Sequence, residues 1–196
     1  MNIEERAAEV KQDQCKRWHV IYVHAKHEKR VHDSLTKNGV HSFLPLKKEM
    51  HQWSDRRKWV EVPLYSGYVF TRIDEGEKLR VFACDGFVKF LSNNGKPSIV
   101  PDWQMDSIRK ITALYPAQVE SLTEGCIGKS GEIIAGVLAG LRGEIVEISN
   151  EHYFTIRIEG LDRVLALKVP ADSIRIFACK TVPSELNHSG KENISA

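Results

Sequence analysis

The fold is decided by one stretch of the C-terminal half, Gly136-Val137-Leu138-Ala139-Gly140-Leu141-Arg142-Gly143-Glu144-Ile145-Val146-Glu147-Ile148. Its glycines lie four and three residues apart and lead at once into an alternating apolar and charged run. Glycine readily adopts the positive φ angles that tight turns need, and an alternation of period two indicates a strand. The stretch therefore predicts a tight turn, with Gly136, Gly140 and Gly143, that feeds a strand.

Working outward from this turn, the C-terminal half contains short β-branched runs separated by Gly, Asn, Asp and Pro. Such spacing is typical of closely packed strands joined by tight turns. A small closed barrel satisfies it best, because closure removes exposed sheet edges. We predict a five-stranded, SH3-like β-barrel over residues 128–178, with strands at 132–134, 144–148, 153–159, 163–169 and 173–177.

The N-terminal half mixes strands with helices. Segregated strands and helices predict an α+β domain over residues 17–116, in which helices flank an antiparallel sheet. A flexible arm (1–16), a linker (117–127) and a disordered tail (179–196) complete the expected organisation. The expected strands are 17–23, 41–48, 59–62, 65–73, 86–91 and 97–100, and the expected helices are 26–38, 76–83 and 102–115, the last with Asp102 as its N-cap.

Composition narrows the class of protein. The 28 Lys and Arg residues against 26 Asp and Glu residues give a net charge of +2, which excludes a strongly basic nucleic-acid coat. No apolar run approaches the roughly 20 residues that span a bilayer, and the start of the chain lacks an apolar signal region. The four cysteines are widely separated, so we expect neither a zinc ribbon nor a disulfide framework, and we place the protein in the reducing cytoplasm.

Enzymatic function is not indicated, because the sequence lacks the common nucleophile, phosphate-loop and metalloprotease motifs. We expect no metal and no cofactor. Positive groups on the helix at 26–38 give a local patch that a nucleic acid can contact, although an ordinary solvated helix face explains the same charges. Aromatic residues concentrate near the Ser66-Gly67 turn, where they form either core or an exposed protein-binding surface.

The glycine turn resembles the KOW motif, a small β-barrel module of transcription and ribosomal proteins. The segments Arg17-Trp18-His19-Val20-Ile21-Tyr22-Val23 and Val62-Pro63-Leu64-Tyr65-Ser66-Gly67-Tyr68-Val69-Phe70 resemble the N-terminal domain of NusG-type elongation factors. The stretch 53–58 is most similar to the specialised RfaH-like and UpxY-like paralogues. The resemblance covers about residues 17–177.

This resemblance implies a non-enzymatic factor that binds RNA polymerase, holds its clamp closed and suppresses pausing or termination on long operons such as polysaccharide loci. The clamp helices of the β′ subunit would contact an aromatic patch, and the β lobe side would be reached near Lys78 and Arg80. Weak contact with non-template or upstream DNA is implied for the first helix. The implied patch is Trp18, Tyr65, Ser66, Tyr68, Phe70 and Phe87, and the implied DNA contacts are His24, Lys26, His27, Lys29 and Arg30.

Two departures from the family pattern leave alternatives open. Ser66 replaces a proline, and Gly136-Val137-Leu138 replaces the usual Gly-Pro-Phe of the KOW turn. The KOW partner is therefore either a small-subunit ribosomal protein, the terminator Rho, or neither. A general NusG factor and a ribosome-associated KOW RNA-binding protein are the alternative functions, and some relatives refold the barrel into a helical hairpin that masks the polymerase patch.

Overall fold

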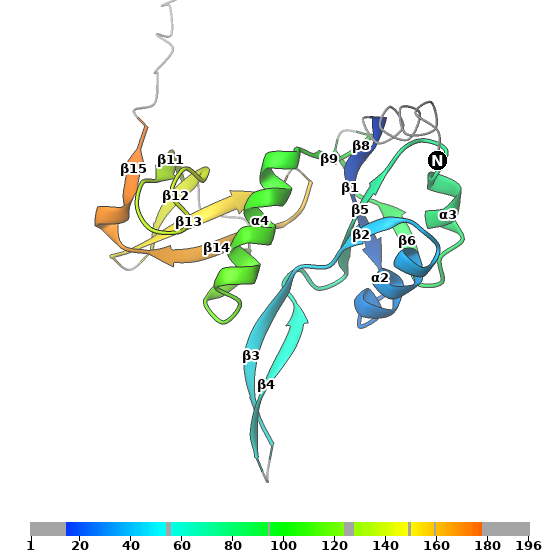
Figure 1. The fold of residues 1–196 in the computed structure, drawn as a ribbon, viewed down its shortest axis with the longest axis horizontal. Coiled ribbons are helices and arrows are strands. Elements are labelled where there is room, and N and C mark those ends of the chain that lie inside the picture. Colours follow the sequence, from blue (N-terminus) through cyan, green and yellow to red (C-terminus); the bar gives the residue numbers. More distant parts are fainter. Residues whose placement is uncertain are drawn as a thin grey trace, which may run out of the picture.

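The computed structural model describes residues 15–53, 56–93, 95–123, 128–148, 150–158 and 160–177. The predicted arm and tail therefore lie outside the described residues, apart from Cys15 and Lys16. The chain forms two β-rich units, and helix α4 (Asp102–Leu114) lies between them (Figure 1). This is the predicted α+β architecture.

The N-terminal unit is built on an antiparallel sheet of order β2-β5-β1-β6, with β9 also paired to β1. The central strand β1 pairs with β5 so that Val20 lies opposite Phe70 and Ile21 opposite Val69. Because successive side chains point to opposite faces, the sheet has two apolar faces. The strands are β1 (Arg17–Val23), β2 (His41–Phe43), β5 (Tyr68–Ile73), β6 (Phe87–Phe90) and β9 (Ile99–Val100).

Helices cover both faces of this sheet. Val31 and Leu35 of α2 (Glu28–Lys37) and Val81 of α3 (Lys78–Phe82) are buried with Ile21 and Val23 on one face. On the other face, α4 buries Met105, Ile108 and Ile111 in a core that includes Trp18, Val20 and Phe70. The N-cap of α4 is Pro101 and not the predicted Asp102; the fixed φ of proline suits a helix start, and Asp102 serves as the acidic residue of the first turn.

A long β-hairpin leaves the N-terminal unit. Its strands β3 (Leu46–Gln52) and β4 (Arg57–Pro63) pair only with each other among the described residues. Figure 1 shows this hairpin projecting away from both units. Its base contacts the rest of the chain, where the Lys48 amide donates to the Pro116 carbonyl at 2.6 Å. The strand expected at 41–48 is divided between β2 and β3, and the strand expected at 59–62 lies within β4. A second, shorter hairpin joins β7 (Ser92–Asn93) to β8 (Lys96–Pro97).

The C-terminal unit is one antiparallel sheet of order β10-β14-β13-β12-β11-β15. All five expected strands are present, as β11 (Lys129–Ile133), β12 (Arg142–Ile148), β13 (Glu151–Arg157), β14 (Arg163–Val169) and β15 (Ile174–Ile176). A sixth strand, β10 (Val119–Thr123), pairs with β14 along residues we expected in the linker. The sequence of β10 alternates polar and apolar residues, because an edge strand buries only one face. Its polar residues therefore suggested a linker. The short 3-10 helix η1 (Ala171–Ser173) precedes β15.

The glycines of the deciding stretch act in two different ways. Gly136 and Gly140 have φ of +75° and +87°, as a tight turn requires. Gly143 instead allows close approach, because a Cβ there would lie 2.5 Å from the Thr155 carbonyl oxygen and 2.8 Å from the Phe154 ring. Gly140 also lines a groove of about 940 Å³ between the turn and α4.

Candidate functional site

The Ser66-Gly67 turn is held by a buried carboxylate. The Gly67 amide donates a 2.7 Å hydrogen bond to Glu28 Oε1, and the Gly67 carbonyl accepts one from Val23. Gly67 has φ of +85°, and a Cβ at this position would lie 2.9 Å from the Tyr22 ring. A close backbone approach is therefore present at Gly67, and its partner is the Tyr22 ring.

The aromatic residues of the predicted polymerase patch do not share one surface. Four of them, which we call the inner rings, belong to the core on the α4 side of the sheet: Trp18, Tyr65, Tyr68 and Phe70. Phe87 packs on the opposite face, against the core formed with α2 and α3. The split follows from the register, since Phe87 pairs with Val23 and not with Tyr22.

The inner rings lie in the interior of the described structure. Trp18, Tyr65 and Phe70 are fully buried, Tyr68 is half-buried, and only Ser66 is exposed. Tyr65 and Phe70 approach with their ring centroids 6.0 Å apart. The guanidinium of Arg109, on α4, lies 4.7 Å from the centroid of the Trp18 ring and 5.2 Å from that of Phe43. Such cation–π contacts stabilise the packing of the rings. Sequence reasoning missed Arg109 because it is far along the chain from both rings.

The C-terminal unit covers the inner rings. The Tyr65 hydroxyl faces the backbone of Leu165, and burial raises the pKa of this hydroxyl. The pKa of Tyr68 is also raised, first by burial and then by the nearby Asp162 carboxylate. One apolar core continues from these rings to Phe154, Ile156 and Leu165 of the C-terminal sheet. The two units are therefore joined through the predicted patch.

Polar and steric contacts fix the same junction. The Gln104 side-chain amide on α4 donates to the Arg157 carbonyl at 3.1 Å. Gly160, with φ of +80°, lies so close to the first unit that a Cβ there would be 3.0 Å from the Ser98 hydroxyl and 3.5 Å from Leu91. Ser98 is buried. A larger side chain at position 98 would clash with the backbone turn at Gly160.

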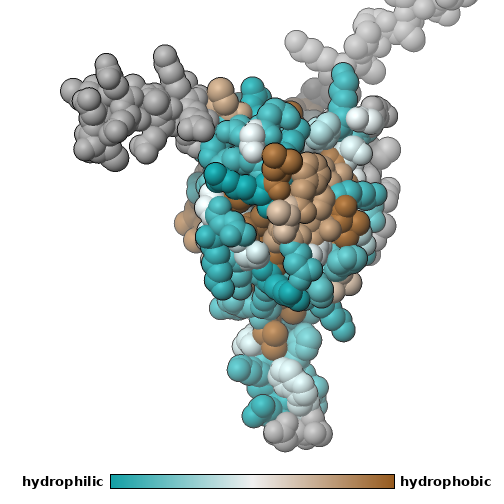
Figure 2. All heavy atoms as spheres, turned by 90° about the vertical axis from the view of Figure 1, so that its right-hand side faces the viewer, coloured by the Kyte–Doolittle hydropathy of each residue, from teal (hydrophilic) through white to brown (hydrophobic). Residues whose placement is uncertain are grey.

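The opposite face of the sheet carries a second aromatic group. Phe82, Phe87 and Phe90, which we call the outer rings, contact one another edge-on with centroids 5.3–5.5 Å apart. Phe82 is 53% exposed and its helix neighbour Leu79 is 75% exposed. The side of the molecule that bears α3 shows an apolar area surrounded by polar residues (Figure 2). Phe87 thus belongs to an open surface, whereas the other predicted rings are covered.

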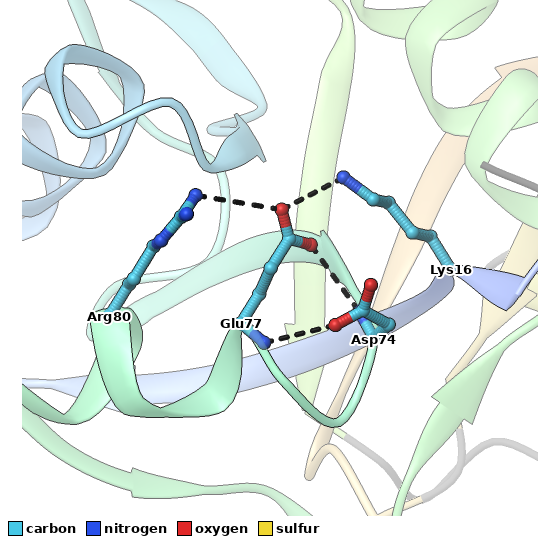
Figure 3. Close-up of polar contacts among 4 residues, drawn as sticks. All are labelled: Lys16, Asp74, Glu77 and Arg80. Atoms are coloured by element: carbon cyan, nitrogen blue, oxygen red, sulfur yellow. Dashed lines mark hydrogen bonds and ion pairs between the residues drawn. The ribbon is translucent and has the colours of Figure 1, made fainter. Parts of the chain in front are cut away.

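Both predicted cations on α3 have acidic partners, and Arg80 belongs to a local network with Lys16, Asp74 and Glu77 (Figure 3). The Glu77 amide donates to Asp74 Oδ1 at 3.0 Å, while Glu77 Oε1 pairs with Lys16 at 2.8 Å and with Arg80 at 3.9 Å. Lys78 pairs with Glu75 at 2.7 Å. This network anchors the start of β1 to α3, and Arg80 is the more exposed of the two predicted cations.

The predicted DNA-contacting residues lie together around the start of α2, and two of them have partners. Lys29 Nζ donates to the Glu61 carbonyl at 2.7 Å, and Arg30 pairs with Asp85. Lys26 is exposed with φ of +66°, and His24 is exposed beside His27. Glu28, the acidic residue in the first turn of α2, is buried and anchors the Gly67 turn.

His19 is a buried titratable group that sequence reasoning left unassigned. It is 7% exposed, its ring lies 5.9 Å from that of Phe90, and its Nδ1 has no well-aligned hydrogen-bond partner among the described residues. Burial, helped by the charge of Lys78, lowers the pKa of His19. No cluster of three potential metal ligands occurs within the described ranges, and no helix there is long and apolar enough to span a membrane.

These features can be compared with known proteins. The family model described as transcription termination factor NusG matches residues 16–109. Residues 16–109, which form most of the N-terminal unit, are of the NusG type. The match covers the N-terminal sheet, helices α2 and α3 and the Gly67 turn, and it supports a transcription elongation or termination factor. No curated protein sequence matches the chain.

Solved structures are similar to this chain to different degrees. NusG of Thermotoga maritima, from a structure described as "Domain interaction in Thermotoga maritima NusG", is 19% identical, with a TM-score of 0.50 over 85% of this chain and 99% of the other. Two conformations of the MjSpt4:Spt5 complex also match, at 14% and 16% identity and TM-scores of 0.27 and 0.22, over 81% and 82% of this chain and 95% and 98% of theirs. At this identity, the Thermotoga likeness supports the two-unit fold of this NusG-type chain.

Proposed function

We propose that this NusG-type protein binds RNA polymerase through its N-terminal unit, holds the clamp closed and suppresses pausing or termination on particular long operons, in the cytoplasm. The observation that carries the proposal is the set of inner rings. Four aromatic side chains gather on one sheet face, and they are covered by a separate unit of the same chain. Aromatic clusters of this kind are the usual anchors of protein interfaces.

Binding through the inner rings requires the two units to separate. The closed arrangement competes with the polymerase for Tyr65, Tyr68 and Phe70, so apparent affinity falls by the fraction of open molecules. Polymerase then shifts the population toward the open state, because it binds only that state. The outer rings and Arg80 remain available in the closed molecule for a second contact on the β lobe side.

We assign the DNA contact to the start of α2. His24 and Lys26 are exposed there, while Lys29 and Arg30 are engaged within the protein. A patch with so few free cations makes only a few phosphate contacts, and the interaction is weak and sensitive to salt. A released C-terminal unit would present its own turns to Rho or to a small-subunit ribosomal protein.

Capture of core RNA polymerase by the immobilised full-length protein tests the proposal. Tyr68→Ala is expected to reduce capture strongly, because Tyr68 is one of the inner rings. Its side chain is only half-buried, so its truncation removes little packing from the folded protein. Ser98→Arg is expected to increase capture, since the larger side chain meets Gly160 and favours the open state. Ser130→Arg, at an exposed site on β11, is the matched control.

The outcome separates the two faces. Loss of capture with Phe87→Ala but not with Tyr68→Ala would move the interface to the outer rings. Absence of capture by both the wild type and Ser98→Arg would reject polymerase binding. Suppression of pausing or termination on many templates, and not on a few, would identify a general factor.

A further inference from the structure

The hairpin formed by β3 and β4 carries large apolar side chains that nothing else in the described structure covers. Trp59 is 51% exposed, Trp53 45% and Met50 48%. Neither strand pairs with any other strand among the described residues, and the hairpin projects from the unit that bears it (Figure 1). Large exposed indoles on a projecting ribbon mark a binding surface.

Both faces of the ribbon combine an indole with cations. Trp59 lies opposite Met50, and side chains two residues along a strand share a face. Lys48 and Arg57 therefore lie on the Trp59 face. Trp53 stacks near His51, at 5.8 Å between ring centroids, on the face that carries Lys58.

Charge on the hairpin favours an anionic ligand. Residues 46–63 contain five Lys and Arg residues and three acidic residues, although the whole chain is close to neutral. Glu49 is engaged by Lys47 at 2.6 Å and lies 3.5 Å from His51. Arg56, Arg57 and Lys58 are exposed and have no ion-pair partner among the described residues. The cations near the tip are therefore available to phosphates.

We propose that the β3–β4 hairpin binds single-stranded nucleic acid, with bases stacked on Trp53 and Trp59 and phosphates paired with the neighbouring cations. Indole faces stack on unpaired bases of any sequence, and positive side chains follow the backbone. Paired bases in a duplex leave no face for an indole to cover. The Lys29 contact with Glu61 places the α2 cations at the base of this ribbon, so the hairpin extends the same side of the protein.

Binding of fluorescein-labelled 12-mer oligonucleotides to the full-length protein tests the proposal, with fluorescence anisotropy as the readout and no polymerase present. The wild type is expected to bind oligo(dT) and oligo(U) similarly and to bind a matched duplex much more weakly. Trp53→Ala plus Trp59→Ala is expected to lower single-strand affinity about tenfold or more, because two stacking platforms are lost. Trp103→Ala removes an equally exposed indole from α4 and is the matched control.

Charge variants provide the second readout. Arg57→Gln plus Lys58→Gln is expected to reduce the slope of log affinity against log salt by about 1.4, at about 0.7 for each single-strand phosphate contact. Lys37→Gln plus Lys96→Gln, at exposed positions elsewhere, should leave the slope unchanged.

Three results would overturn the proposal: no binding by the wild type at low salt, tighter binding of the duplex, or equal losses in the hairpin and Trp103 variants. Because the assay omits polymerase, each of these results is distinct from a failure of the proposed function. All these variants carry surface substitutions, and the midpoint of urea unfolding of each one verifies that it is folded.

Discussion

At the scale of single residues, one glycine and one carboxylate shape the turn beside the inner rings. The buried carboxylate of Glu28 satisfies the Gly67 amide, and the missing side chain of Gly67 leaves room for the Tyr22 ring. An unsatisfied amide in this position would cost about 1–3 kcal/mol. The geometry of the turn therefore depends on a helix residue that precedes it by 39 positions.

Gly67→Ala is expected to destabilise the protein more than Gly39→Ala. Both glycines have positive φ, which costs an alanine about 1–2 kcal/mol. A Cβ at position 39 meets nothing within 4 Å, whereas one at position 67 meets the Tyr22 ring at 2.9 Å. Urea unfolding of the two variants measures the difference, and equal losses would contradict the close approach.

At the scale of elements, the N-terminal sheet encloses an imidazole where a hydrocarbon side chain would be expected. The ring of His19 on β1 lies 5.9 Å from that of Phe90 on β6. Burial and, after it, the charge of Lys78 lower the pKa of His19, and the charge of Glu75 opposes them. The folded sheet thus favours the neutral form of this imidazole. Its protonation couples the packing of α3 against the sheet to pH.

Acid is expected to destabilise the protein through His19. The pKa of His19 in the folded state is lowered from 6.5, so the unfolded chain binds the proton first. Stability contributed by the neutral imidazole is complete above the unfolded pKa and declines as pH falls below it. We expect the free energy of unfolding to fall from pH 7.5 to pH 5.5, and to fall less in His19→Gln. Parallel pH profiles for the two proteins would rule out His19 as the source.

At the scale of the whole molecule, the two units share one core. The inner rings contribute to it from the N-terminal sheet, α4 lies in the middle, and Phe154 and Leu165 contribute from the C-terminal sheet. Domains that share an apolar core unfold together, whereas domains joined by a polar contact move independently. The same contact that stabilises the closed molecule keeps the proposed polymerase surface covered.

Calorimetry is expected to show a single unfolding transition for the wild type and two for Ser98→Arg. Opening the junction at Gly160 leaves each sheet to unfold with its own core. The exposed Ser130→Arg variant should retain one transition. Two transitions in the wild type would show that the shared core does not couple the units.

The sequence by itself determined most of the elements and the order of the two units. β-branched and aromatic composition marked β1, alternation marked β12, helical spacing marked α2 and α4, and the glycine spacing marked the turn at 136–143. These signals are local, because each depends on the period of one element or on the φ of one residue. The NusG-type resemblance followed from the same short segments.

Only the tertiary structure decided which predicted residues act together. A shift in register at β6 sent Phe87 to the face opposite the inner rings, and packing of the C-terminal unit covered Tyr65 and Phe70. Tertiary packing also paired Val119–Thr123 with β14 as a strand, and it placed the buried Glu28 carboxylate beside the Gly67 amide. Contacts between residues far apart in the chain depend on how the elements pack, and the period of any single element carries no record of that packing.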